Sequence, residues 1–123
     1  MKRYNRENNK LLAIDIYEWC MKKEFWEDVI IYFDGKAWSS NSTWSGVNGK
    51  KIAEDLYEYE DRNPLNYFSY ANPDTVSISF EGILYDILNY GSGKTEKEFE
   101  KLFEKYGLYY EYGHAWNLAA YEL

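Results

Sequence analysis

Apolar residues recur at helical spacing near the start of the chain. The ones that share one face of a helix over residues 9–23 are Leu12, Ala13, Ile16, Trp19 and Cys20. Ile14, Tyr17 and Met21 widen that apolar side. Spacings of three and four residues are typical of an amphipathic helix that buries one face. The pattern therefore predicts a largely buried first helix over residues 9–23.

Two segments show the patterns of antiparallel hairpins. Residues 28–33 are β-branched and aromatic, the Asp34-Gly35 pair follows, and residues 36–40 can run back. An Asp-Gly pair between two such runs is typical of a type I′ turn. Residues 108–112 and 115–121 flank Gly113-His114 and predict a second hairpin. Residues 39–49 are rich in Ser, Asn and Gly around Trp44, which indicates a loop or a short edge strand.

The rest of the chain predicts one more strand and three more helical segments. Residues 75–80 alternate polar with apolar, as a strand with one buried face does. Residues 50–61 carry Ile52, Leu56 and Tyr59 at helical spacing, and Pro64 ends this second predicted helix. Residues 83–90 form a short helix or buried segment. In residues 95–106, Thr95 and Glu98 match a capping box, and Gly107 supplies the stop.

These elements indicate a single domain of the α+β class. A chain of 123 residues is large enough for one core and too short for two. Helices and hairpins are interspersed without the regular alternation of strand and helix that builds a parallel sheet. We therefore expect one compact domain over residues 1–123, with an antiparallel sheet built from hairpins and packed against three to four helices.

Composition changes the picture through aromatic content and charge. Aromatic residues make up 20% of the chain, with 14 tyrosines, so some of them must reach the surface. The formal net charge of −7 disfavours direct binding to nucleic acid or to an anionic membrane. A basic protein partner is favoured instead.

The polar start of the chain and its single cysteine lead us to expect a cytoplasmic protein. Residues 1–10 are charged and polar and hold no apolar stretch of a secretion signal, and no later apolar run approaches the length of a membrane span. Cys20 is the only cysteine, so no internal disulfide can form.

Candidate catalytic motifs are few. Residues 91–95, Gly-Ser-Gly-Lys-Thr, are similar to the end of a phosphate-binding loop, but Leu88 stands where the full motif needs a glycine. A glycine turn before a helix explains the same residues. His114 is the only histidine, so no catalytic triad or histidine-metal cluster can be assembled. Cys20 fits a buried small hydrophobe better than a nucleophile. We expect no cofactor, no metal and no catalytic residue.

The candidate binding residues are carboxylates and aromatics. If residues 50–61 are helical, Glu54, Glu58 and Asp61 share one face beside Asp55. Their Cβ atoms would lie about 5–6 Å apart, comparable to the spacing of phosphates, so such a ridge could imitate nucleic acid. An ordinary solvated helix face has the same pattern. In the helix over residues 95–106, glutamates 96, 100 and 104 form one column and lysines 97, 101 and 105 the next, which hints at an interface.

Aromatic residues in the predicted hairpins and loops complete the candidate site. Trp38, Trp44 and Tyr110 are the anchors that we expect in a protein interface, and core packing is the alternative role for each of them.

These features predict a non-catalytic protein that binds a basic site on another protein, such as a nuclease or another nucleic-acid-handling enzyme. Immunity proteins against nuclease toxins and phage-borne inhibitors of defence nucleases, including CRISPR nucleases, often have this size and charge, and this analogy suggests the same role. Two alternatives stay open. One is a small enzyme using carboxylates, tyrosines and His114, and the other is a carbohydrate- or ligand-binding module using Trp38 and Trp44.

Overall fold

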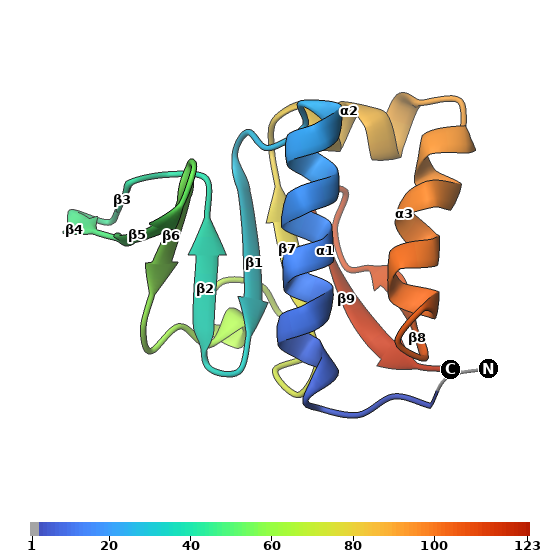
Figure 1. Ribbon diagram of the computed structural model, residues 1–123, viewed down its shortest axis with the longest axis horizontal. Coiled ribbons are helices and arrows are strands. Elements are labelled where there is room, and N and C mark those ends of the chain that lie inside the picture. The colour runs from blue at the N-terminus through green and yellow to red at the C-terminus, as the bar shows by residue number, and fades with distance from the viewer. Residues whose placement is uncertain (1–2) are drawn as a thin grey trace.

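The computed structural model describes residues 3–123, which fold as one α+β domain (Figure 1). Three α-helices are present in this range: α1 (Asn8–Lys23), α2 (Ile83–Tyr90) and α3 (Lys94–Glu104), together with the short 3-10 helix η1 (Pro64–Asn66). The strands are β1 (Val29–Phe33), β2 (Lys36–Ser39), β3 (Thr43–Trp44), β4 (Val47–Asn48), β5 (Lys50–Ala53), β6 (Leu56–Tyr59), β7 (Ser77–Phe80), β8 (Leu108–Tyr112) and β9 (Asn117–Glu122).

The main sheet has seven strands in the order β5-β6-β2-β1-β7-β9-β8, and every neighbouring pair is antiparallel. Strands β3 and β4 form a separate two-stranded hairpin. Three of the pairings are hairpins of consecutive strands, and β7 joins the N-terminal hairpins to the C-terminal one. The predicted class, an antiparallel sheet of hairpins packed against three to four helices, is confirmed, with three α-helices in the described residues.

The helices cover one face of this sheet, as Figure 1 shows with α1 in front of the central strands and α3 beside it. The side chains that point from the strands toward the helices alternate along each strand, as pleating requires. The fully buried ones include Val29, Ile31, Ile78, Phe80 and Leu118. They pack against Leu12 and Ile16 of α1, Leu84 of α2, and Phe99 and Phe103 of α3.

The opposite face of the sheet, which we call the helix-free face because none of the α-helices α1, α2 and α3 covers it, carries a second and smaller core. Its buried members are Tyr32, Ala37, Tyr59 and Phe68. The β3–β4 hairpin and residues 60–72, which include the short 3-10 helix η1, lie over this face in place of an α-helix. Because both faces of the central strand β1 are covered, β1 is apolar on both sides, with Ile31 in the large core and Tyr32 in the small one.

The predicted helix over residues 50–61 is wrong, because this segment forms the β5–β6 hairpin. Leu56 and Tyr59 are both buried, but they point to opposite faces of the sheet, Leu56 into the large core and Tyr59 into the small one. A strand covered on both faces loses its alternation of polar and apolar residues, so its apolar positions can imitate helical spacing. Asp55 adopts a left-handed conformation (φ 52°) in the turn between the strands, which a helix does not contain.

The capping box predicted for the last helix is also wrong. This helix begins at Lys94, its N-cap is Gly93, and no side chain caps it. Glu98 contacts α1 instead, where it accepts a hydrogen bond of 3.3 Å from the Trp19 indole and pairs with Lys23 at 3.0 Å. The helix itself is confirmed.

The remaining predicted elements are confirmed with small shifts of their ends. The first helix spans Asn8–Lys23, and the final hairpin pairs β8 with β9. In the first hairpin, Asp34 (φ 51°) and Gly35 (φ 76°) both have positive φ, as the central residues of a type I′ turn require. For residues 39–49 we expected a loop or a short edge strand, and this stretch holds the short strands β3 and β4, which form a separate small hairpin.

Candidate functional site

A half-open hollow of about 230 Å³ lies on the helix-free face of the sheet. We call it the aromatic hollow. Its walls are formed by the aromatic residues Tyr32, Trp44, Tyr67 and Trp116, and its remaining lining by Asp28, Ile30, Asn41, Ser79 and Glu81.

Strand pairing sets the rim of the aromatic hollow at one end of β1 and β7. The backbone N–H of Glu81 donates a hydrogen bond of 3.1 Å to the carbonyl of Asp28. Asp28 directly precedes β1 and Glu81 directly follows β7, so the two carboxylate residues lie at the same end of these paired strands. Phe80 donates a backbone hydrogen bond of 2.8 Å to the carbonyl of Trp116, which brings the loop before β9 to the same end. On the floor, Ile30 of β1 pairs with Ser79 of β7.

The aromatic walls contact one another. The ring centroids of Trp44 and Tyr67 are 5.0 Å apart, those of Tyr32 and Tyr67 are 5.8 Å apart, and those of Tyr32 and Trp44 are 6.0 Å apart. Trp116 contacts Phe68 of the small core at 5.8 Å. These distances lie in the range in which aromatic pairs stabilise each other, so the walls support one another's orientation.

The β3–β4 hairpin brings Trp44 to the aromatic hollow because its ends are tied to the main sheet. The hydroxyl of Tyr59 donates a hydrogen bond of 2.9 Å to the carbonyl of Asn41, just before β3. Ser45 (φ 52°) and Gly46 (φ 78°) form the two-residue turn. Gly49, just after β4, approaches the Tyr59 ring so closely that a Cβ atom there would lie 2.7 Å from a ring carbon.

The charges at the rim are negative. Asp28 and Glu81 are exposed, and no Lys, Arg or His lines the aromatic hollow. Within residues 3–123, neither carboxylate takes part in an ion pair. Burial raises the pKa of Tyr32 to about 12, with a smaller contribution from the charge of Glu81, so this hydroxyl stays protonated at neutral pH. The aromatic hollow therefore combines electron-rich ring faces with two unpaired anions.

A guanidinium group from this chain already contacts the same aromatic cluster. The Cζ atom of Arg62 lies 4.9 Å from the Trp44 ring centroid and 5.6 Å from that of Tyr59. The Nε atom of Arg62 is buried and has no hydrogen-bond partner in the described part of the chain. Cation–π attraction accounts for this position of Arg62.

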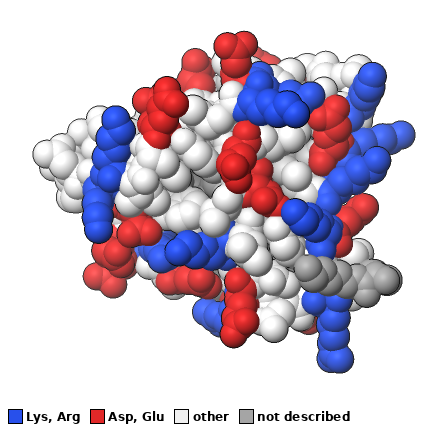
Figure 2. Space-filling view, in the orientation of Figure 1, with Lys and Arg blue, Asp and Glu red and all other residues white. Residues whose placement is uncertain are grey.

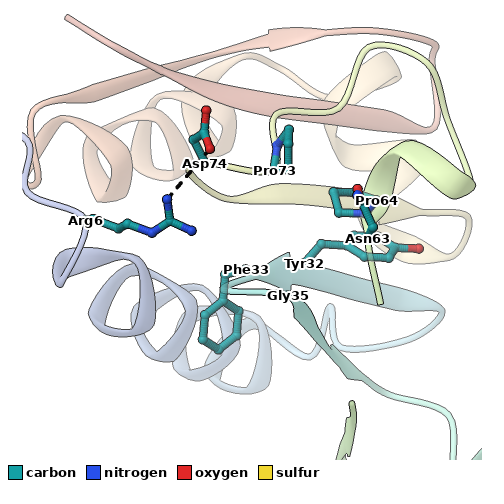
Figure 3. Close-up of a pocket in the computed structure, with 8 residues that line it drawn as sticks. All are labelled: Arg6, Tyr32, Phe33, Gly35, Asn63, Pro64, Pro73 and Asp74. Atoms are coloured by element: carbon teal, nitrogen blue, oxygen red, sulfur yellow. Dashed lines mark ion pairs between the residues drawn. The ribbon is translucent and has the colours of Figure 1, made fainter. Parts of the chain in front are cut away.

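A second hollow, of about 240 Å³, lies beside the β1–β2 turn, and its lining residues are drawn in Figure 3. Its charged residues, Arg6 and Asp74, pair with each other at 3.7 Å. The remaining lining residues are Tyr32, Phe33, Gly35, Asn63, Pro64 and Pro73. Because its two charges neutralise each other, this hollow offers a ligand less electrostatic selectivity than the aromatic hollow does.

A third, more apolar groove of about 480 Å³ runs between α1 and the β5–β6 hairpin. Its apolar residues include Ile14, Tyr17 and Ile52, with Trp38 and Glu58 also in the lining. The hydroxyl of Tyr17 on α1 donates a hydrogen bond to the carbonyl of Glu54 in the hairpin. The indole of Trp26, in the segment after α1, donates one of 2.7 Å to the carbonyl of Asp55.

The predicted acidic residues do not form one ridge. Glu54 and Asp55 are exposed in the β5–β6 turn, and Asp61 is exposed after the end of β6. Glu58 points to the helix-covered face, where its carboxylate accepts a hydrogen bond of 3.0 Å from the Trp38 indole and lies 3.6 Å from Lys36 Nζ. On that face, acidic and basic side chains are intermixed (Figure 2). A continuous column of carboxylates requires the helix that this segment does not form.

The three predicted aromatic anchors lie in three different places. Trp38 is buried in the large core with 4% of its surface exposed. Tyr110 packs on Phe99 and Phe103 of α3, with ring centroids 5.4 and 5.0 Å apart. Trp44 is partly exposed and lines the aromatic hollow.

Hydrogen bonds inside the molecule use part of the predicted glutamate column of α3. Glu96 accepts hydrogen bonds from the hydroxyls of Tyr110 at 3.3 Å and Tyr112 at 2.5 Å. Burial and the nearby carboxylates raise the pKa values of both tyrosines, so both hydroxyls remain donors at neutral pH.

His114 and Cys20 occupy structural positions. The ring of His114 stacks on Trp116 at 5.5 Å, and its Nδ1 lies 3.1 Å from Nδ2 of Asn117. Cys20 is buried, and burial raises the pKa of its thiol to about 12, so the thiolate that a nucleophile needs is disfavoured. Within residues 3–123, no group of three or more His, Cys, Asp or Glu side chains is placed to hold a metal ion.

Sequence reasoning missed Asp28, Glu81, Tyr67 and Trp116 as site residues. They are far apart in the chain, and strand pairing and the segment over residues 60–72 bring them together.

Comparisons with the models of known protein families, with curated proteins and with solved structures found no match to this chain. In the described range, no helix has both the length and the apolar character needed to cross a membrane.

Proposed function

We propose that this protein is a non-catalytic binding module that recognises a basic protein and, by occupying the basic site of a nucleic-acid-handling enzyme, inhibits it. The observation that carries the proposal is the aromatic hollow, where the unpaired carboxylates of Asp28 and Glu81 stand beside exposed aromatic surface. The net charge of −7 favours approach to a positively charged surface and opposes approach to nucleic acid itself.

Charge and aromatic surface have separate roles in this proposal. Complementary charges speed the encounter between two proteins and exclude wrong partners. Aromatic side chains such as Trp44 and Tyr67 provide a large contact area at low cost in conformational entropy, and such residues dominate binding energies in protein interfaces. The exposed carboxylates of Glu54, Asp55 and Asp61 lie outside the aromatic hollow. They add to the long-range electrostatic attraction between this protein and a basic partner.

The test is affinity purification from the native host with the tagged full chain, followed by mass spectrometry of the captured proteins. We expect a basic nuclease, or another enzyme that handles nucleic acid, to be captured at low salt and released as salt is raised. The purified enzyme should then lose activity when this protein is added. Capture of no basic protein, or capture of one whose activity is unchanged, contradicts the inhibitor role.

A second candidate function, carbohydrate or small-ligand binding, is favoured by the same aromatic walls together with the polar residues Asn41 and Ser79. Sugars stack on tryptophan faces, and Trp44 and Trp116 supply two. The volume of about 230 Å³ is below the roughly 300–1,000 Å³ that is usual for small-molecule pockets, which favours a single side chain of a protein partner. An enzyme using His114 is the weaker alternative, because this residue is held in the stack with Trp116.

A further inference from the structure

The aromatic hollow has the chemistry of a receptor for one positively charged side chain. Three observations bear on which cation it takes: the electron-rich walls, the two carboxylates at the rim, and the guanidinium group that this chain already places on the same aromatic cluster.

The walls suit a flat cation. Tryptophan and tyrosine faces attract cations placed within about 6 Å of the ring centroid, and arginine forms such contacts more often than lysine because it is planar and less strongly hydrated. The ring centroids of Trp44 and Tyr67 are 5.0 Å apart, and the two ring planes are tilted by 44°. Tyr32 forms a third aromatic wall beside them. These rings line the aromatic hollow, so a planar group that enters it meets aromatic surface.

The rim suits a group with several N–H donors. Carboxylate oxygens of Asp28 and Glu81 accept hydrogen bonds, and a guanidinium presents five donors in a fixed plane. The backbone hydrogen bond joins these two residues, and both line the aromatic hollow, so a group bound there has both carboxylates in its surroundings. An ammonium group has only three donors and no flat face.

Arg62 shows that the cluster accepts a guanidinium. Its Cζ atom lies 4.9 Å from the Trp44 ring centroid, although no carboxylate pairs with it in the described part of the chain. Arg62 does not line the aromatic hollow. The aromatic hollow offers an arginine both contact with Trp44 and the two carboxylates that Arg62 lacks.

We propose that the aromatic hollow binds a single arginine side chain presented by the protein partner. This inference rests on the proposed function, because it assumes that the ligand is a basic protein, and it specifies the residue recognised. The aromatic walls contact the guanidinium plane, Asp28 and Glu81 accept its N–H groups, and Asn41 and Ser79 lie in the same lining for the remaining donors.

The test uses the full chain and two small probes, the acetylated amides of arginine and of citrulline, which have nearly the same size and differ in charge. The indole N–H signals of the five tryptophans are followed by NMR while each probe is added at millimolar concentration. We expect the Trp44 and Trp116 signals to shift and saturate with the arginine probe. The Trp38 signal should stay in place because this residue is buried.

The decisive variant is Asp28→Asn combined with Glu81→Gln, which keeps the shape of the aromatic hollow and removes its charge. Asp28 has a left-handed backbone (φ 53°), and asparagine tolerates that conformation, so the fold should be kept. We expect at least a tenfold loss of affinity for the arginine probe, which corresponds to about 1.4 kcal/mol. The matched control, Asp86→Asn with Glu111→Gln, changes two exposed carboxylates that do not line the aromatic hollow and should bind the probe as the unchanged protein does.

Three results would overturn the inference: no shift of the Trp44 and Trp116 signals with the arginine probe, equal shifts with citrulline, or unchanged affinity in the double variant. Equal binding of citrulline would support a site for neutral ligands instead. The proposed function is tested separately, because a partner that is still captured and inhibited when the aromatic hollow takes no arginine would leave that proposal standing.

Discussion

The indole Nε1 of Trp38 donates a hydrogen bond of 3.0 Å to the carboxylate of Glu58, directly across the β2–β6 strand pair. Both side chains point toward the helix-covered face, and Lys36 Nζ lies 3.6 Å from the same carboxylate. Glu58 therefore stabilises the sheet. We expect a change at this position to lower the free energy of unfolding rather than to change a binding surface.

Replacing Glu58 by alanine should destabilise the protein by about 1–3 kcal/mol, because it leaves the buried indole donor of Trp38 without its partner. Glu58→Gln keeps an acceptor and should cost less. Urea unfolding of both variants measures the difference. The neighbouring Glu60 is exposed, so Glu60→Ala is the matched control. Equal stability of Glu58→Ala and Glu60→Ala would contradict the role of this hydrogen bond.

The hydrogen bond from Trp38, with help from Lys36, holds the pKa of Glu58 below its ordinary value. A carboxyl group whose pKa is lower in the folded state adds stability above its unfolded pKa and loses that contribution as pH falls through the folded pKa. The stability difference between the unchanged protein and Glu58→Gln should therefore be larger at pH 7 than at pH 3. Unfolding curves at both pH values check this, and a difference that grows at low pH would be inconsistent with it.

Replacing Asp55 by glycine distinguishes the β5–β6 hairpin from a helix. In the structure Asp55 has φ 52°, so Asp55→Gly should leave stability unchanged or raise it. If residues 50–61 were helical, the same change would cost roughly 0.3 kcal/mol, because glycine is a poorer helix former than aspartate. Asp55→Val should destabilise the hairpin by about 1–2 kcal/mol, since a β-branched residue resists positive φ. A clear loss of stability in Asp55→Gly would count against the hairpin.

Alkaline pH should weaken the fold through Tyr32. Burial raises the pKa of Tyr32 from 10.0 to about 12. A group whose pKa is raised in the folded state contributes stability that is complete below its unfolded pKa and is lost as pH rises through the folded one. The unchanged protein should therefore lose more stability between pH 10 and pH 12 than Tyr32→Phe does. Tyr70→Phe, at a tyrosine with 60% of its surface exposed, is the control and should follow the unchanged protein.

The elements that the sequence predicted correctly are those whose signal is local. Asp34 and Gly35 define a type I′ turn by their own backbone preferences, and Leu12 and Ile16 lie on a helix that buries a single face. The β5–β6 hairpin lacks such a signal. Its two buried residues, Leu56 and Tyr59, pack into cores on opposite faces of the sheet. The alternation of apolar and polar residues that normally identifies a strand is therefore absent from the sequence.

The aromatic hollow was not predictable, because its parts meet only through tertiary structure. Asp28 and Glu81 become neighbours when β1 pairs with β7, and Trp116 joins them when β9 pairs with β7. Of the predicted anchors, Trp44 alone lines the aromatic hollow, because the β3–β4 hairpin folds over the helix-free face. No spacing in the sequence indicates this arrangement.

Charge reversal and aromatic truncation should affect partner binding in different ways. Glu54→Lys, at an exposed turn, should slow association and reduce its salt dependence. Trp44→Ala should chiefly speed dissociation, with a loss of about 1–3 kcal/mol if this residue lies near the centre of the interface. Surface plasmon resonance with the captured partner separates the two rates. Equal effects of both variants on both rates would contradict this division.

The most direct measurement is the association rate of the full chain with its captured partner at low and at physiological salt. We predict that the rate falls on the order of tenfold as salt rises and that the Asp28→Asn, Glu81→Gln variant shows a smaller fall. An association rate that does not change with salt, or tight binding of the unchanged protein to DNA or RNA at physiological salt, would contradict the account.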